Sequence, residues 1–170
     1  MLAIGDVILR SVNFVFLVVA LGLTGSLAAT TVYQGNPQVN FAVFAAAFGL
    51  LTSSIYGVFA YFVAAFAWPI VLATFDFLNL VFTFAAATAV AAGIKVHSCT
   101  NQSYLKDNNI VQGKENRCRK AQASVAFLYF SFFIFLASAV FSIINVVKGG
   151  LFSTSTRSAP RVGVPTMSQV

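Results

Sequence analysis

Charged residues are confined to short stretches of this chain, and the long segments between them carry almost none. From Ser11 to Ile94 the only charged side chain is Asp76, and residues 121–147 have none. Eight charged residues fall instead within residues 95–120. Long uncharged segments separated by short polar connections are typical of membrane-spanning helices.

The composition excludes several classes of protein. Ten basic and four acidic side chains among 170 residues, with 59% hydrophobic residues, cannot cover the surface of a soluble domain. Soluble domains carry about 25% charged residues. A disordered chain requires low hydrophobicity and high charge, which is the opposite pattern. The length also leaves no room for a large enzyme with separate cofactor and substrate domains.

Four apolar segments are long enough to cross a bilayer: about residues 7–29, 39–63, 69–94 and 121–147. A helix rises about 1.5 Å per residue, so about 20 apolar residues span the hydrocarbon core. The runs are continuous rather than alternating, which favours helices over barrel strands. We therefore predict an all-α membrane protein. Its four-helix transmembrane domain covers residues 1–147, and a flexible tail covers 148–170.

An even number of spans places both termini on one side of the membrane, but the residues give conflicting signals about which side. The loop at 95–120 carries more basic residues than the two termini, which favours a cytoplasmic loop. The chain's only cysteines, Cys99 and Cys118, lie in this loop and would pair in an oxidising compartment. Two free thiols in the cytoplasm are the alternative. Asn101 begins a glycosylation sequon, Asn-Gln-Ser, in the same loop.

Asp76 lies within the third span, about 10 Å below the interface, where an ionised carboxylate normally marks a partner or a function. Arg10 lies near the start of the first span, which enters from the same side. Asn13 and Asn79 each follow three residues later, on the same helix face. We expect these four residues to form a polar intramembrane cluster. It would be an interhelical clamp, a pocket for a lipid headgroup from the cytoplasmic leaflet, or part of a proton or ion path.

Small residues recur at four-residue intervals in three spans, a pattern that lets membrane helices approach closely. The residues are Gly22 and Ser26 in the first span, Ala45, Gly49, Ser53 and Gly57 in the second, and Ala85, Ala89 and Gly93 in the third. We expect contacts inside the bundle. Self-association between copies of the chain is the alternative.

Signals for catalysis are weak in this sequence. Its one histidine, His97, has no carboxylate pair nearby, and the sequence contains no metal-spaced Cys/His cluster and no phosphate-binding glycine loop. We therefore expect no enzyme activity, no cofactor and no metal site. The net charge of +6 is divided between two membrane faces, so nucleic acid is not an expected partner.

The tail combines hydroxyl and basic side chains. Phosphorylation candidates are Ser153, Thr154, Ser155, Thr156 and Ser158. The nearby Arg157 and Arg161 would attract anionic lipid, and phosphate would oppose that attraction. A solvated tail without lipid contact is the alternative.

Several stretches along nearly the whole chain are similar to those of a known protein family. They include MLAIGDVILR at residues 1–10, AWPIVL at 67–72, FDFLN at 75–79, RCRKAQA at 117–123 and VGVPTMSQV at 162–170. These stretches resemble the fungal non-classical export protein family, whose members are small tetraspan plasma-membrane proteins with the MARVEL arrangement. Because the similar stretches include a loop and the tail, the resemblance extends beyond shared hydrophobicity.

The resemblance implies a multi-pass protein of the plasma membrane with both termini in the cytoplasm. It thereby supports an extracytoplasmic loop at 95–120 and a disulfide between Cys99 and Cys118. It also implies a role in organising the furrow-like membrane domains called eisosomes and in responding to sphingolipid state. A transporter or export factor for proteins without signal peptides is the alternative. The expected partners are sphingolipid and other membrane lipids such as sterol, eisosome proteins on the cytoplasmic face, and further copies of the chain.

Overall fold

The protein is a bundle of long helices in the computed structural model, which describes residues 4–32, 35–62, 68–95 and 97–149. The helices are α1 (Ile4–Ala29), α2 (Pro37–Gly49), α3 (Tyr56–Phe62), α4 (Pro69–Ile94), α5 (Gln102–Asp107) and α6 (Glu115–Gly149), and the π-helix η1 (Leu50–Ile55) joins α2 to α3. Four helical segments in this part of the chain are long and apolar enough to cross a membrane. The predicted all-α, four-helix membrane fold is confirmed.

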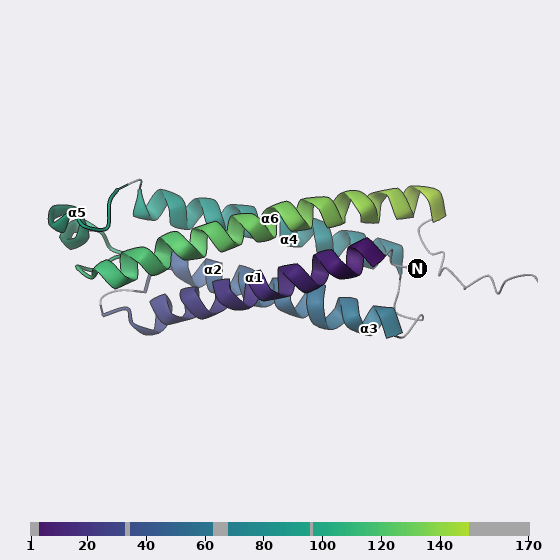
Figure 1. Cartoon of the computed structure of the whole chain (residues 1–170), viewed down its shortest axis with the longest axis horizontal. Helices are drawn as coiled ribbons and strands as arrows, with labels where there is room; N and C mark the ends of the chain where they lie inside the picture. The colour runs from purple at the N-terminus through teal and green to yellow at the C-terminus, as the bar shows by residue number, and fades with distance from the viewer. Residues whose placement is uncertain (1–3, 33–34, 63–67, 96, 150–170) are drawn as a thin grey trace, which may run out of the picture.

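The four spans form a ring in which each packs against two neighbours (Figure 1). Helix α1 contacts α2 and α6, and α4 contacts the same two helices. Helix α1 therefore lies diagonally opposite α4. Helices α1 and α4 both begin at the end of the bundle where α6 finishes, and α5 lies at the other end (Figure 1). Residues early in α1 can thus meet residues early in α4 inside the bundle.

The helix boundaries follow local sequence signals. Pro37 and Pro69 occupy the first turns of α2 and α4, where a missing backbone N–H costs no helical hydrogen bond. Helix α4 has the same bounds as the predicted third span. Helix α6 begins at Glu115, before the predicted start at residue 121, because an acidic side chain is favourable in a first helical turn.

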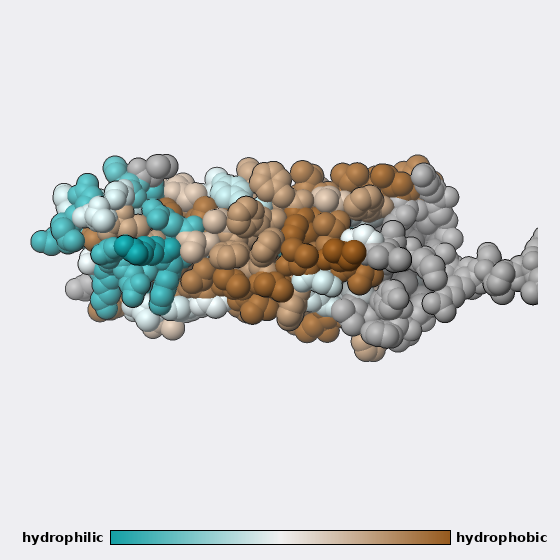
Figure 2. Space-filling view, in the orientation of Figure 1, coloured by the Kyte–Doolittle hydropathy of each residue, from teal (hydrophilic) through white to brown (hydrophobic). Residues whose placement is uncertain are grey.

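The apolar core occupies the half of the bundle nearer α5. Its side chains are mainly small: Ala20, Ala42, Ala45, Ala46, Ala86, Ala87 and Ala121, with Leu27, Val39, Val90 and Leu128 among the larger ones. Such small residues let membrane helices pack closely. Figure 2 shows hydrophilic residues gathered at the end that carries α5 and apolar residues along the middle of the bundle. The other half of the interior holds a group of buried polar side chains together with apolar ones such as Leu72, Phe135 and Ala139.

Candidate functional site

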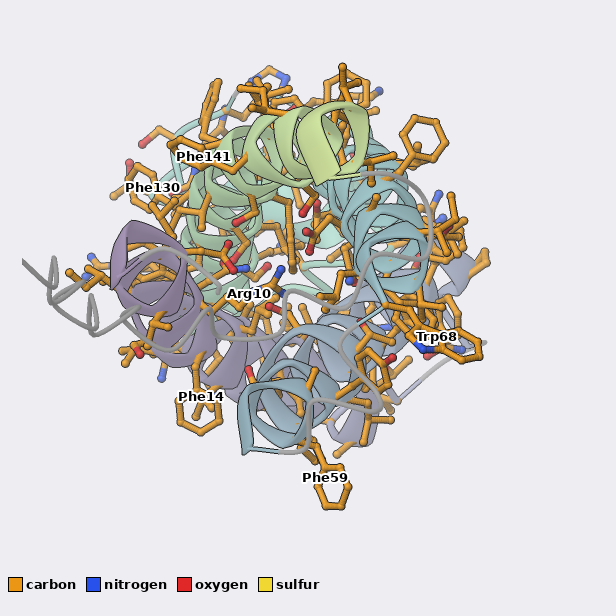
Figure 3. All side chains as sticks on the ribbon, turned by 90° about the vertical axis from the view of Figure 1, so that its right-hand side faces the viewer. Arg10, Phe14, Phe59, Trp68, Phe130 and Phe141 are labelled. Atoms are coloured by element: carbon orange, nitrogen blue, oxygen red, sulfur yellow. A yellow bond between two sulfur atoms is a disulfide. The ribbon has the colours of Figure 1, made fainter. Side chains whose placement is uncertain are left out.

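A polar core fills the bundle near the starts of α1 and α4. In α1 the inward-facing stripe runs through Asp6, Arg10, Asn13 and Leu17, at intervals of three or four residues. This spacing follows one helix face. Figure 3 shows Arg10 pointing into the space that the helices enclose. The sequence thus delivers three polar side chains to the interior from a single helix.

Arg10 binds two carboxylates at once. Its Nη2 lies 2.9 Å from Oδ2 of Asp76, and its Nε lies 3.0 Å from Oδ2 of Asp6. Arg10 is 8% exposed, Asp76 is 1% exposed and Asp6 is 4% exposed. The expected pairing of Arg10 with Asp76 is therefore present in the structure. The second carboxylate, from Asp6, was not expected.

The other two spans complete the surroundings of this ion pair. Ser142 of α6 donates a hydrogen bond of 2.6 Å to Oδ2 of Asp76. From η1, Ser53 accepts a long hydrogen bond of 3.5 Å from Nη1 of Arg10. A Cβ atom on Gly57 of α3 would lie 3.3 Å from Cδ of Arg10. All four spans therefore contact the Arg10–Asp76 pair, an arrangement that can fix their relative positions.

The two asparagines do not pair as one cluster. Asn79 is fully buried, and its amide donates a 2.7 Å hydrogen bond to Thr52 of η1. Asn13 is 1% exposed, and neither atom of its amide has a partner among the described residues. The predicted set of four is therefore gathered in one buried region. The hydrogen bonds of this region form two groups, namely the Arg10–Asp76 ion pair and, about one helical turn away, the contact between Asn79 and Thr52.

The π-helix η1 presents polar side chains to this core. The backbone N–H of Tyr56 bonds to the carbonyl of Leu51, five residues earlier, instead of four as in an α-helix. Within this segment, Thr52 contacts Asn79 and Ser53 contacts Arg10. Single π turns inside α-helices are frequent at functional sites. The second span is thus continuous from Pro37 to Phe62 but wider at the polar core.

The small residues of the second span pack inside the bundle. A Cβ on Gly49 would lie 3.0 Å from Leu17 Cδ1, and Ala45 and Ser53 are buried. In α4, Ala85, Ala89 and Gly93 are half-buried, and a Cβ on Gly93 would lie 2.5 Å from Ile110 Cδ1. These glycines therefore permit contacts that larger residues would block.

The expected close contact at Gly22 is wrong for the bundle. Gly22 is exposed, and nothing among the described residues lies within 4 Å of the position of a Cβ. Ser26, one turn later, accepts a 2.8 Å hydrogen bond from Nζ of Lys120. Spacing alone could not distinguish a helix face that meets a neighbour from one that faces outward.

A disulfide closes the loop at the far end of the bundle. Cys99 and Cys118 are bonded, with their Cα atoms 5.7 Å apart, and pack against Leu105 and Val111. The bond links the segment after α4 to the first turn of α6. It therefore restrains the third connection, whatever compartment the loop faces.

A second polar contact, which the sequence analysis missed, ties this loop to α1. Arg117 is 4% exposed, and its guanidinium donates to the carbonyl oxygens of Leu27 and Ile110, both at 3.1 Å. It also donates to the hydroxyl of Thr30. Arg117 thus satisfies a carbonyl near the end of α1, where the helix leaves its last carbonyl groups without internal partners.

The glycosylation candidate Asn101 is exposed and caps α5. Its side-chain oxygen accepts from the backbone N–H groups of Ser103 and Tyr104, at 3.2 and 3.4 Å. Beside it, the hydroxyl of Tyr104 donates to the carbonyl of Ile94, and burial raises the pKa of Tyr104. The sequon is therefore accessible but held in a helix start.

The part of the chain that the structure describes contains no group of three or more His, Cys, Asp or Glu side chains able to hold a metal. The tail candidates Ser153, Thr154, Ser155, Thr156 and Ser158 lie outside the described residues. The polar core combines an ion pair with oxygen atoms that have no partner among the described residues, so it can hold helices together and bind a small polar or charged species.

Comparison with known proteins agrees with this architecture. Residues 2–141 match the MARVEL family, described as a membrane-associating domain. The chain is 79% identical to Non-classical export protein 102 of Candida albicans and 52% identical to Non-classical export protein 2 of Saccharomyces cerevisiae, with full coverage of each. The chain belongs to the non-classical export protein family. It is thus a multi-pass membrane protein with a MARVEL domain.

The family also extends to a more distant relative. This MARVEL protein is 32% identical to Non-classical export protein 2 homolog of Schizosaccharomyces pombe over 126 residues, which cover 74% of this chain and 69% of that protein. No solved structure matches the chain.

Proposed function

We propose that this chain is a non-enzymatic organiser of the plasma membrane that helps build eisosome-type furrow domains and responds to sphingolipid state. The observation that carries the proposal is the contrast between the interior and the outer surface of the bundle. The interior is occupied by packed apolar residues and by a buried polar core. The outer surface is where the chain can meet lipids and other proteins.

Large apolar side chains cover this outer surface. Phe14, Phe59, Trp68, Phe130 and Phe141 point away from the bundle axis (Figure 3), and each is 47–55% exposed. In a bilayer these rings face acyl chains and sterols. An aromatic surface of this kind supports a function that depends on the surrounding lipid composition.

The orientation that goes with this function has the disulfide loop outside the cell and both termini in the cytoplasm. A disulfide persists in an oxidising environment, which supports an extracytoplasmic loop. In this orientation the tail, residues 148–170, is available to eisosome proteins and to kinases on the cytoplasmic face.

An export factor is the second candidate. It is supported by the names of the relatives, which are called non-classical export proteins. Passage of a substrate through the bundle is disfavoured, because Arg10, Asp76, Asn79 and Leu17 fill its interior side by side with less than 10% exposure. Export would therefore use the outer surface of the bundle and its partners.

Localisation with and without sphingolipid synthesis separates the two functions. The tagged chain should lie in patches that disperse when synthesis is blocked, and release of leaderless proteins should stay unchanged when the chain is deleted. A uniform distribution together with lost release would contradict the organiser.

The role of the aromatic surface is tested by replacing Phe130, Phe133 and Phe141 with Leu, which keeps the helix apolar but removes the rings. The matched control replaces Val140 and Ile143, which are exposed on the same helix, with Leu. The first variant should lose the patches while the control keeps them. Normal patches in both variants would show that the rings are not required.

A further inference from the structure

Acidic groups outnumber basic groups in the described part of the polar core. Asp6 and Asp76 both bind Arg10, and their side chains are 5% and 1% exposed. Two carboxylates and one guanidinium leave one uncompensated negative charge when all three groups are ionised. A charge of this kind is costly in an apolar environment unless it is paired.

A second observation, independent of charge, comes from oxygen atoms without partners. Oδ1 of Asp6, Oδ1 of Asp76 and Oδ1 of Asn79 are buried and have no hydrogen-bond partner among the described residues. The same holds for both amide atoms of Asn13, which lies on the inward face of α1 between Arg10 and Leu17. Buried polar atoms normally have a partner in the protein, in ordered water or in a bound species. The amide oxygen of Asn13 and the Oδ1 atoms of Asp76 and Asn79 are therefore candidate ligands.

We propose that the polar core binds one monovalent alkali-metal cation, for which Na⁺ is the probe. Carboxylate and amide oxygens are ligands that hard cations prefer. One positive charge balances the deficit left by Asp6, Asp76 and Arg10. A phosphate group fits poorly, because the guanidinium of Arg10 is already engaged by two carboxylates.

The position of the core explains why a cation would matter to the fold. Asp6 lies seven residues before Asn13 in α1, about 10 Å along the helix, so one ion cannot contact both. Asp6 therefore contributes negative charge, and the candidate ligands are Asn13 of α1 and Asp76 and Asn79 of α4, the diagonally opposite span. A bound ion shared between these helices would hold them together. The charged and amide side chains of the core are all less than 10% exposed, so we propose a structural ion site rather than a path. The proposal goes beyond the organiser function and does not depend on it.

The test is the melting temperature of the purified full-length chain in nanodiscs, at constant pH and ionic strength. NaCl, KCl and N-methyl-D-glucamine chloride are compared. We expect the melting temperature to rise by about 3 °C or more with Na⁺, relative to N-methyl-D-glucamine, and to saturate with concentration. Equal melting temperatures in all three salts would overturn the proposal.

Two variants and a control localise the ion. Asp6→Asn leaves a balanced Arg10–Asp76 pair, so it should fold and lose the Na⁺ response. Asn13→Val keeps every charge but removes an amide oxygen, and should raise the Na⁺ concentration for half-maximal response about tenfold or more. Asp107→Asn removes an exposed acid at the other end of the bundle and should respond as the parent does.

A proton could neutralise the excess negative charge in place of Na⁺, and the two cases give different melting-temperature results. If the melting temperature of the parent depends on pH but not on Na⁺, the excess charge is neutralised by a proton, and the cation site is wrong. An undiminished Na⁺ response in both Asp6→Asn and Asn13→Val would also overturn it, because the ion would then bind elsewhere.

Discussion

The guanidinium of Arg10 in the first span donates a 2.9 Å hydrogen bond to the carboxylate of Asp76 in the third span, 66 residues later in the chain. Both residues are less than 10% exposed, and Ser53 and Ser142 from the other two spans make hydrogen bonds to the pair. This contact joins the two diagonally opposite helices of the ring. We interpret it as an interhelical clamp.

Removing one partner of the clamp should destabilise the bundle. Arg10→Gln should strongly lower the folded yield in detergent, because it leaves two buried carboxylates without a cation. Asp76→Asn should lower the yield less, because Arg10 keeps Asp6 as a partner but the ion pair between α1 and α4 is lost. Breaking a buried pair costs about 3–5 kcal/mol in soluble proteins and less in lipid, where water defects relieve part of the cost. Fluorescence-detected size-exclusion chromatography measures the yield.

The same variants distinguish the clamp from a lipid sensor. If Asp76 reads a headgroup, Asp76→Asn should fold normally and lose its redistribution on sphingolipid depletion. The clamp predicts instead that Asp76→Asn lowers the amount of folded protein, and that any loss of redistribution is secondary to this.

Glycine replacements should show which helix faces are packed. Gly49→Leu and Gly57→Leu should destabilise the bundle by about 1–3 kcal/mol each, because the added side chains meet Leu17 and Arg10. Gly22→Leu is the matched control, since the position is open, and should fold normally. Thermal unfolding in detergent provides the measurement. Equal stability of the three variants would contradict the packing described for the second span.

The disulfide should be extracytoplasmic and stabilising. An impermeant thiol reagent should not label intact cells, and should label Cys99 and Cys118 after reduction. Replacing both cysteines with Ser should lower stability by about 3 kcal/mol, the value expected for closing a loop of this size. Labelling of both thiols only after permeabilisation would place the loop in the cytoplasm.

The carbonyl contacts of Arg117 should be specific to its guanidinium. Arg117→Lys should reduce stability by about 1.5–3 kcal/mol, because a single ammonium cannot reach the carbonyls of Leu27 and Ile110 together. Arg119→Lys is the control, since its side chain is 68% exposed and binds only Glu115 in the described contacts. Similar unfolding temperatures for the two variants would remove Arg117 from the account.

The spans and the ion pair could be predicted because charge is so scarce in this chain. With Asp76 alone in the third span and Arg10 at the matching depth of the first, few pairings were open. Asp6 carried a usable signal that the sequence analysis did not use, since it lies four residues before Arg10 on the same helix face. Considering that interval would have predicted two carboxylates for one guanidinium.

Other features depend on three-dimensional packing and have no local signal. The spacing of Asn13 and Asn79 identifies a helix face but not which of three other helices it meets. The same limit explains Gly22, whose four-residue interval to Ser26 is as compatible with lipid as with a neighbouring helix. The π turn at Leu50–Ile55 depends on contacts of Thr52 and Ser53 with other spans. Residue propensities within the segment do not encode those contacts.

The most direct test of the clamp is a double-mutant cycle between Arg10 and Asp76. Performed on the Asp6→Asn chain, it removes the second carboxylate, so each single variant leaves one lone charge and the double variant leaves none. The unfolding free energies of Arg10→Gln, Asp76→Asn and the double variant are compared in bicelles. We predict that the free energy of unfolding lost in the double variant is smaller than the sum of the two single losses by more than about 1 kcal/mol. Losses that add within about 0.5 kcal/mol would show that the two residues do not stabilise each other.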